Sequence, residues 1–161
     1  MLNFQDLYES YAPEVYRFVF WLARDSFEAE DITSETFIRA WTKNSRIRTE
    51  TLKAYLFTIA RNVFLEQRRN RKRQVALKDD MPDPTPGPDK LVESQLELSR
   101  VRRVLQTIPE IDRTAFVLRV QHELPYAEIA RVLRLSLSAS KVKVHRVRKK
   151  LLSTLTEKEV A

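Results

Sequence analysis

Apolar side chains recur at intervals of three and four residues through most of the chain, which is the spacing of helices with one buried face. In the first half this pattern covers residues 4–24, 27–43 and 52–69. Pro13 is expected to separate a short first helix from a second one, because proline lacks the backbone N–H that a helix interior needs. The pattern therefore predicts several helices and no strand in this half.

The segment 27–43 carries apolar and acidic side chains on different faces. Asp25 or Ser26 is placed to cap it. Its inward face is expected to consist of Ala29, Ile32, Thr33, Phe37, Ala40 and Trp41. Most of its outward face is expected to consist of Glu28, Asp31, Ser34 and Glu35. The next helix, 52–69, follows a basic loop and is expected to end in a basic run.

The pattern changes over Lys78–Asp89. Alternate positions there hold four of the chain's seven prolines, next to its one glycine, Gly87. Proline at alternate positions excludes a helix and favours extended backbone. This stretch is interpreted as a linker between two domains, and a surface loop within one domain is the alternative.

Helical spacing returns after this stretch, over 91–107, 111–120, 126–133 and 137–155. The short helix 126–133, a three-residue turn and the long last helix have the pattern of a helix-turn-helix. Ser136 or Ser138 is placed to cap the second helix of this motif. The residues expected to face inward in the motif are Ile129, Ala130, Leu133, Val142 and Val147.

The last helix is rich in short polar and long basic side chains. Short polar residues can approach base edges in the DNA major groove, and long cations neutralise phosphates. A basic helix that is only solvated, or that lies on a membrane surface, is the alternative. The residues expected to bind DNA are Ser138, Ser140, Lys141, Lys143, His145, Arg146 and Lys149.

The composition narrows the possible classes of protein. A net charge of +7 favours an anionic partner, nucleic acid before a membrane surface, although many basic proteins bind no anion. A single glycine argues against nucleotide-binding folds and hairpin-rich β folds. No cysteine is present, and neither a signal peptide nor a membrane-spanning stretch is seen. We expect an all-α protein of two small domains in the cytoplasm, with no cofactor and no metal.

Four stretches together resemble one family. Residues 29–41, Ala-Glu-Asp-Ile-Thr-Ser-Glu-Thr-Phe-Ile-Arg-Ala-Trp, resemble the segment by which sigma factors grip RNA polymerase. Residues 52–62 and the basic run after them are similar to the family's helix for the promoter element nearest the start site. Residues 125–130 and 145–151 are similar to its domain for the more distant element. The compact length resembles the extracytoplasmic-function group of sigma factors.

The resemblance implies a division into domains at 1–75 and 95–161, with a linker over 76–94. It implies that Asp31, Ser34, Glu35 and Ile38 contact the clamp helices of the largest subunit of the bacterial RNA polymerase core. It also implies an anti-sigma partner, no membrane insertion and no enzymatic activity.

The resemblance further implies how the chain binds promoter DNA. A base flipped out of the near element would enter a pocket beside the loop 44–51, and Asn62 could contact it. The helix-turn-helix would bind the distal element. Tyr55, Phe57 and Phe64 are expected to lie in the core, and stacking on bases is the alternative. The residues implied to bind the near element are Arg46, Arg48, Arg61, Asn62, Arg68, Arg69 and Arg71.

The sequence departs from the family pattern at four positions. Ser34 stands where glutamine is usual, and Ser140 stands where an apolar residue usually packs. Arg134 and Ser138 replace two glycines around the turn, so Arg134 is expected to adopt a left-handed backbone.

Two other functions compete with this interpretation. A stand-alone helix-turn-helix regulator would leave the acidic segment 29–41 unexplained. An enzyme acting on nucleic acid would need clustered carboxylates or a histidine-based site. Asp31 and Glu35 alone, one helical turn apart, are more typical of a solvated helix face.

Overall fold

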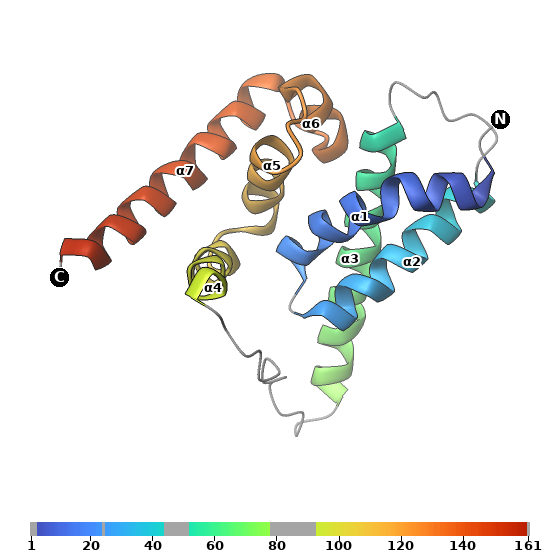
Figure 1. The fold of residues 1–161 in the computed structure, drawn as a ribbon, viewed down its shortest axis with the longest axis horizontal. Coiled ribbons are helices and arrows are strands. Elements are labelled where there is room, and N and C mark those ends of the chain that lie inside the picture. Colours follow the sequence, from blue (N-terminus) through green and yellow to red (C-terminus); the bar gives the residue numbers. More distant parts are fainter. Residues whose placement is uncertain (1–2, 24, 44–51, 78–92, 161) are drawn as a thin grey trace. The chain divides into compact units, whose positions relative to one another are not determined.

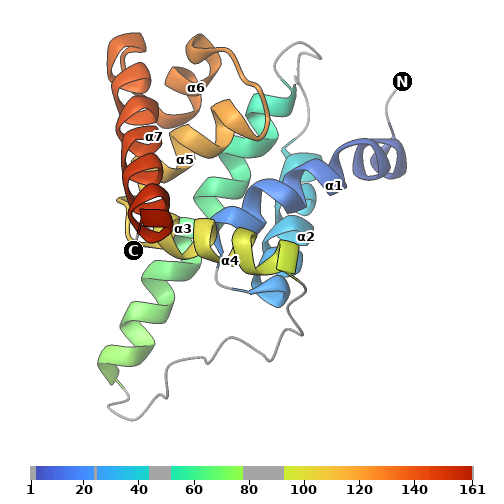
Figure 2. The same cartoon turned by 60° about the vertical axis from the view of Figure 1, so that its left-hand side comes forward.

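The computed structural model describes residues 3–23, 25–43, 52–77 and 93–160. The chain divides into two compact units, Met1–Asp89 and Lys90–Ala161, and each is described by itself. All regular structure in the described ranges is α-helical, as predicted (Figures 1 and 2). The predicted linker falls largely outside the described residues, since these stop at 77 and resume at 93.

In the described residues of the first unit, three helices all pack on one another. They are α1 (Phe4–Leu22), α2 (Ser26–Thr42) and α3 (Leu52–Leu77). The rings of Phe18 and Phe57 are both fully buried, and their centroids lie 4.7 Å apart. Phe64 is buried as well, so the expectation of a core position is confirmed for Phe57 and Phe64, whereas Tyr55 is half-buried.

Pro13 lies inside α1, so the prediction of a break there is wrong. The side chain is exposed, and proline removes one backbone N–H from the helix. Leu7 before it and Val15 after it are both buried in the same core, which holds the two halves in one helix. The N–H of Asp6 donates to the side chain of Asn3 over 2.8 Å, which caps the start of α1.

The two other helices of this unit begin and end close to the predicted positions, with one exception. The Glu28 N–H donates to the Asp25 carboxylate over 2.7 Å, which confirms Asp25 as the cap of α2. Helix α3 continues to Leu77, eight residues beyond the predicted end, so the basic run is helical. Arginine and lysine are good helix formers, and the run holds neither proline nor glycine.

Over residues 93–160, the second unit has four helices around one core. They are α4 (Glu93–Gln106), α5 (Glu110–Val120), α6 (Tyr126–Leu133) and α7 (Leu137–Val160). Pro109 precedes the first turn of α5, where its missing N–H costs no helical hydrogen bond. Helices α5 and α6 both pack on α7. The core residues of this unit include Leu105, Leu118, Ile129, Leu133, Val144 and Val147.

Candidate nucleic-acid interface and acidic helix surface

The turn between α6 and α7 has the geometry of a helix-turn-helix. Arg134 adopts φ 55° and ψ 48°, so the predicted left-handed backbone is confirmed. The Leu135 N–H donates to the Ala130 carbonyl over 2.9 Å and closes the end of α6. The Ala139 N–H donates to the Ser136 hydroxyl oxygen over 3.1 Å, which confirms Ser136 as the cap of α7. These bonds fix where α7 begins.

One face of α7 is exposed and basic. Five of the seven residues predicted to bind DNA lie exposed on it, and these are Ser138, Lys141, His145, Arg146 and Lys149. Arg148 and Lys150 are exposed too and add positive charge. This helix therefore presents cations to solvent along three turns, as a helix that binds a polyanion requires.

Ser140 and Lys143 do not belong to that exposed face, which corrects the prediction that both face DNA. Ser140 is fully buried, and its hydroxyl donates to the Ser136 carbonyl over 3.0 Å. The Lys143 ammonium lies 2.9 Å from the Asp112 carboxylate on α5. Both side chains are therefore engaged inside the unit, where the packing of α7 on α5 places them.

Val142 is 47% exposed, so the prediction that it packs inward is wrong. Between Leu137 and Thr156, the buried positions of α7 are instead Ser140, Val144, Val147 and Leu151, which are spaced four, three and four residues apart. Leu137 is also exposed, at the start of α7. The sequence pattern missed the exposure of Val142 because it assigns apolar residues to the buried face of a helix. Val147 is buried as predicted.

A small cluster stabilises the start of α6. The guanidinium of Arg119 lies 4.3 Å from the centroid of the Tyr126 ring, and it also donates to the Leu124 carbonyl over 3.1 Å. The Lys141 ammonium lies 5.8 Å from the same ring. Tyr126 thereby links α5, α6 and the exposed face of α7.

The outward face of α2 combines acidic, polar and apolar side chains. Asp31 and Ser34 are exposed as predicted, and Ile38 is 52% exposed. Phe27 is 81% exposed beside them, and the sequence pattern missed it. Trp41 was expected inside but is 39% exposed, with its ring edge-on to Phe4 at 5.7 Å between centroids.

Two carboxylates of α2 are bound by side chains of α3. Glu28, expected outside, is buried, and its carboxylate lies 3.4 Å from the Arg71 guanidinium. The Gln67 amide donates to the Asp31 carboxylate over 2.9 Å. A carboxylate without its proton is costly to bury unless it has such a partner, and Arg71 is that partner for Glu28. Both pairs join the two helices.

Arg39 binds two further carboxylates. It lies 2.9 Å from Glu35, one turn before it on α2, and 2.8 Å from Glu66 on α3. Hydrogen bonding to Arg39 lowers the pKa of Glu66 below its ordinary value, and the two carboxylates raise the pKa of Arg39. We call the six-residue set of Glu28–Arg71, Asp31–Gln67 and Arg39–Glu66 the α2–α3 ladder.

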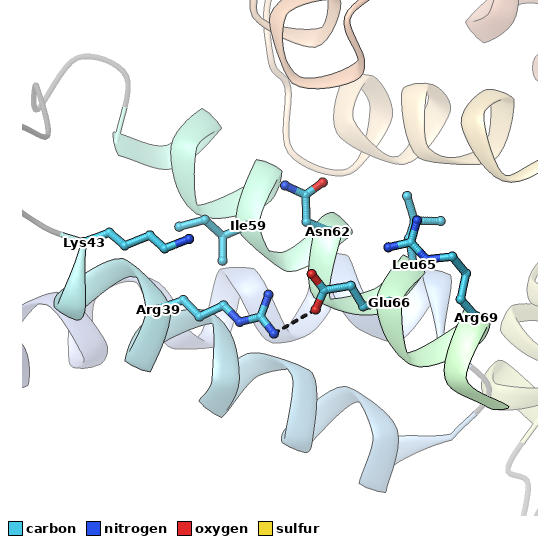
Figure 3. A pocket seen from close by; sticks show the side chains of 7 residues that line it. All are labelled: Arg39, Lys43, Ile59, Asn62, Leu65, Glu66 and Arg69. Carbon is cyan, nitrogen blue, oxygen red and sulfur yellow. Dashed lines mark hydrogen bonds and ion pairs between the residues drawn. The ribbon is translucent and has the colours of Figure 1, made fainter. Parts of the chain in front are cut away.

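A pocket of about 220 Å³ lies beside this ladder (Figure 3). It is lined by Arg39, Lys43, Ile59, Asn62, Leu65, Glu66 and Arg69. In Figure 3 the Arg39 guanidinium and the Glu66 carboxylate meet between α2 and α3. The cationic side chains that line it, Arg39, Lys43 and Arg69, make the pocket suited to a polar or anionic ligand.

The residues predicted to bind the near element are placed differently by the structure. Asn62 and Arg69 are exposed and line the pocket, whereas Arg61 and Arg68 are half-buried on the same helix. The Arg68 guanidinium lies 5.2 Å from the Phe64 ring centroid. Arg71 is held by Glu28, as described above. Arg46 and Arg48 lie outside the described residues.

Sequence reasoning missed Arg39 and Glu66 at the pocket. The signal for Arg39 was present, because Glu35 and Arg39 are spaced to form a pair on one helical face. Glu66 lies 27 residues away from its partner, and no local pattern connects the two.

Comparison with known proteins agrees with this architecture. Residues 7–74 match the family model for Sigma-70 region 2, and residues 98–151 match that for Sigma-70 region 4. ECF RNA polymerase sigma factor SigE of Mycolicibacterium smegmatis is 31% identical over 94% of this chain, which spans 61% of that relative's length. ECF RNA polymerase sigma factor SigM of Bacillus subtilis is 29% identical, with 93% of each chain covered.

A solved structure shares the fold. The sigma factor RpoE of Bartonella quintana, crystallised in complex with the anti-sigma factor NepR, superposes with a TM-score of 0.83 at 27% identity. The match covers 95% of this chain and 96% of that one. Within the described residues, no helix combines the length and apolar character needed to cross a membrane. Both family models, the relatives and the shared fold lead to one assignment: the chain belongs to the extracytoplasmic-function sigma factors, which direct promoter-specific transcription.

Proposed function

We propose that this chain binds RNA polymerase core through α2 and directs it to promoters through two separate DNA contacts, one in each unit. The observation that carries the proposal is the exposed basic face of α7, which follows a helix-turn-helix turn closed by named hydrogen bonds. The turn that joins α6 to α7 distinguishes this arrangement from a single basic helix that is only solvated. The acidic outward face of α2 supplies a second surface of opposite charge.

The exposed face of α7 is proposed to enter the major groove at the distal promoter element. Ser138 lies at the start of the helix, where the residues that approach base edges usually stand. Lys141, Arg146 and Lys149 are proposed to neutralise phosphates, which makes binding weaker as salt rises. Lys143 is proposed to orient the helix through Asp112 rather than to contact DNA.

The pocket beside the ladder is proposed to receive the base flipped out of the near element. Asn62 offers both a donor and an acceptor at its rim, which suits recognition of a base edge. Arg69 lies at the same rim, and the half-buried Arg61 and Arg68 lie on the same helix. We propose that these three cations hold the phosphates on either side.

The outward face of α2 is proposed to bind the clamp helices of the largest polymerase subunit. Asp31, Ser34 and Ile38 are exposed there, so they offer charge, a hydroxyl group and apolar area to a partner. Glu35 is half-buried and paired with Arg39, and we propose that it mainly positions that arginine. Coulomb attraction between Asp31 and basic residues of the partner would steer the encounter.

An anti-sigma protein is proposed as the regulator of this chain. The support is the similar RpoE structure, which was determined in complex with the anti-sigma factor NepR. The exposed apolar side chains on α2, Phe27 and Ile38, are available to such a partner. We further propose that the protein acts in the cytoplasm, where RNA polymerase works, and that it catalyses no reaction itself.

Run-off transcription tests the proposal. Purified polymerase core is mixed with a pool of genomic promoters, with and without the chain. Chain-dependent transcripts from a defined set of promoters are expected. The double variant Asp31→Ala/Ile38→Ala should lose these transcripts together with core binding, whereas Glu9→Ala, an exposed carboxylate on α1, should keep both.

A different result would overturn the proposal. If the chain bound duplex DNA tightly alone, did not bind core and supported no transcript, it would act as a stand-alone regulator. If the double variant transcribed as well as the wild-type chain, the polymerase contact would lie elsewhere than on α2.

A further inference from the structure

The apolar side chain of Val142 occupies the middle of the basic face of α7. A helix turns by about 100° per residue, so Val142 points away from the buried Ser140 and Val144, each two residues distant. Among the exposed residues, Ser138 lies one turn before Val142, and His145 and Arg146 lie one turn after it. Among the α7 side chains that the structure describes, Val142 is the apolar one that lies most directly opposite the core.

The neighbours of Val142 identify what would cover it. A single exposed valine is common on protein surfaces and by itself indicates nothing. Here it is 47% exposed among Lys141, Arg146 and Lys149, a set of cations that fits a polyanion rather than an apolar protein surface. Leu137, one turn before Lys141, is the other exposed apolar side chain at the start of the helix.

In the DNA major groove, the apolar group that a side chain can meet is the C5 methyl of thymine. We propose that Val142 contacts a thymine methyl in the distal promoter element and thereby selects an A·T base pair at that position. The inference rests on the proposed function of α7. It assigns Val142 a part in sequence selection, which contacts to phosphates do not provide.

Replacing thymine by uracil tests the contact, because the exchange removes only the methyl group. The full chain with polymerase core is bound to a duplex promoter, taken from the transcription experiment, in which each distal-element thymine is replaced in turn. At one position, uracil is expected to weaken binding about fourfold, which corresponds to the ~0.8 kcal/mol of one buried methylene-sized group.

Two variants connect that effect to Val142. Val142→Ala should bring the ratio of thymine to uracil promoter binding close to one, because the two γ-methyl groups that would reach the thymine methyl are gone and the shorter alanine side chain stops short of it. Val142→Thr keeps one methyl and should retain part of the difference. Lys149→Ala should weaken binding to both promoters by the same factor and keep the fourfold ratio. Val142 is exposed, so these variants should fold like the wild-type chain, which circular dichroism checks.

Several results would overturn the inference in distinguishable ways. Equal binding of thymine and uracil at every position by the wild-type chain would exclude a methyl contact. A ratio that survives in Val142→Ala would assign the contact to another residue, with Leu137 the first to test. Weaker binding of a protein partner by Val142→Ala, with promoter selection unchanged, would make Val142 part of a protein interface. Failure to bind any promoter specifically would instead overturn the proposed function itself.

Discussion

The ammonium group of Lys143 lies 2.9 Å from the carboxylate of Asp112, and this ion pair joins α7 to α5. The two side chains are only 21% and 11% exposed, so salt screens the pair less than a surface pair. The charge of Lys143 is therefore neutralised inside the unit, on the side of α7 that packs on α5 and not on the exposed basic face.

Breaking this pair should destabilise the second unit. We expect Asp112→Asn and Lys143→Met each to lower its stability by about 1 to 3 kcal/mol, because one charge stays partly buried without its partner. The double variant should lose less than the sum, with a coupling energy of about 1 kcal/mol. Hydrogen exchange of the α5 and α7 amides measures this unit separately. Additive losses would show that the pair contributes nothing.

Lys143 and Lys149 should differ in how they affect the salt dependence of DNA binding. Lys149→Met is expected to reduce the slope of log affinity against log salt by about one, because one phosphate contact disappears. Lys143→Met should leave that slope unchanged, whatever it does to stability. The measurement is a salt titration of promoter binding by the chain with polymerase core. A lower slope for Lys143→Met would return that lysine to the DNA interface.

Glycine at position 134 should stabilise the helix-turn-helix. Arg134 is held at φ 55°, a conformation that costs a residue with a side chain about 1 kcal/mol. We therefore expect Arg134→Gly to raise the stability of the second unit by somewhat less than this, since glycine is also freer in the unfolded chain. Arg131→Gly, at an exposed position inside α6, is the matched control and should lower stability by about 1 kcal/mol. Equal effects of the two variants would contradict the prediction.

The Arg39–Glu66 pair should make the first unit sensitive to acid. The ordinary pKa of the glutamate is 4.5, and Arg39 lowers it in the folded chain. The Glu66 carboxylate of the unfolded chain takes up a proton near pH 4.5, whereas that of the folded chain takes it up only at a lower pH. The pair therefore stabilises the folded chain fully above pH 4.5. This stabilisation is lost as the pH falls through the lowered pKa. The two side chains are 31% and 43% exposed, so the contribution at neutral pH should stay below about 1 kcal/mol.

Glu66→Gln should therefore lose less stability on acidification than the wild-type chain. Both tryptophans, Trp21 and Trp41, lie in the first unit, so tryptophan fluorescence during denaturation reports on this unit alone. Glu9→Gln removes an exposed carboxylate outside the ladder and should leave the acid sensitivity as it is. Identical acid sensitivity of Glu66→Gln and wild type would show that the pair has no such role.

Asn62 should determine base preference at one position of the near element. Asn62→Ala is expected to reduce discrimination there by about 1 kcal/mol, roughly fivefold, because the hydrogen bonds to one base edge are lost. Run-off transcription from promoters with each base at each near-element position measures this. Asn70→Ala, an exposed asparagine on the same helix but outside the pocket, should keep the wild-type preference.

The sequence pattern predicted much of the fold, because helical spacing and caps are local signals. The helix Tyr126–Leu133 has the predicted ends, and Asp25 and Ser136 cap the helices as expected. The break predicted at Pro13 is absent because the effect of a proline depends on tertiary packing. Buried residues on both sides of Pro13 hold α1 together. The unexpected length of α3 reflects the helix preference of its basic residues.

The site was harder to predict, because residue type alone does not decide which face is buried. Ser140 is inside and Val142 outside, the reverse of what their polarity suggests. Glu28 is buried because Arg71, 43 positions further on, pairs with it. Such pairings depend on the packing of α2 against α3, which no local window contains.

The α2–α3 ladder has a consequence for promoter opening under the proposed function. It joins the helix that would bind polymerase to the helix that carries the base pocket, and both belong to the first unit. The packing of α2 on α3 then fixes the distance between the polymerase contact and the flipped base. This distance does not depend on where the second unit lies. The first unit would thereby determine how far from the polymerase surface the DNA strands first separate.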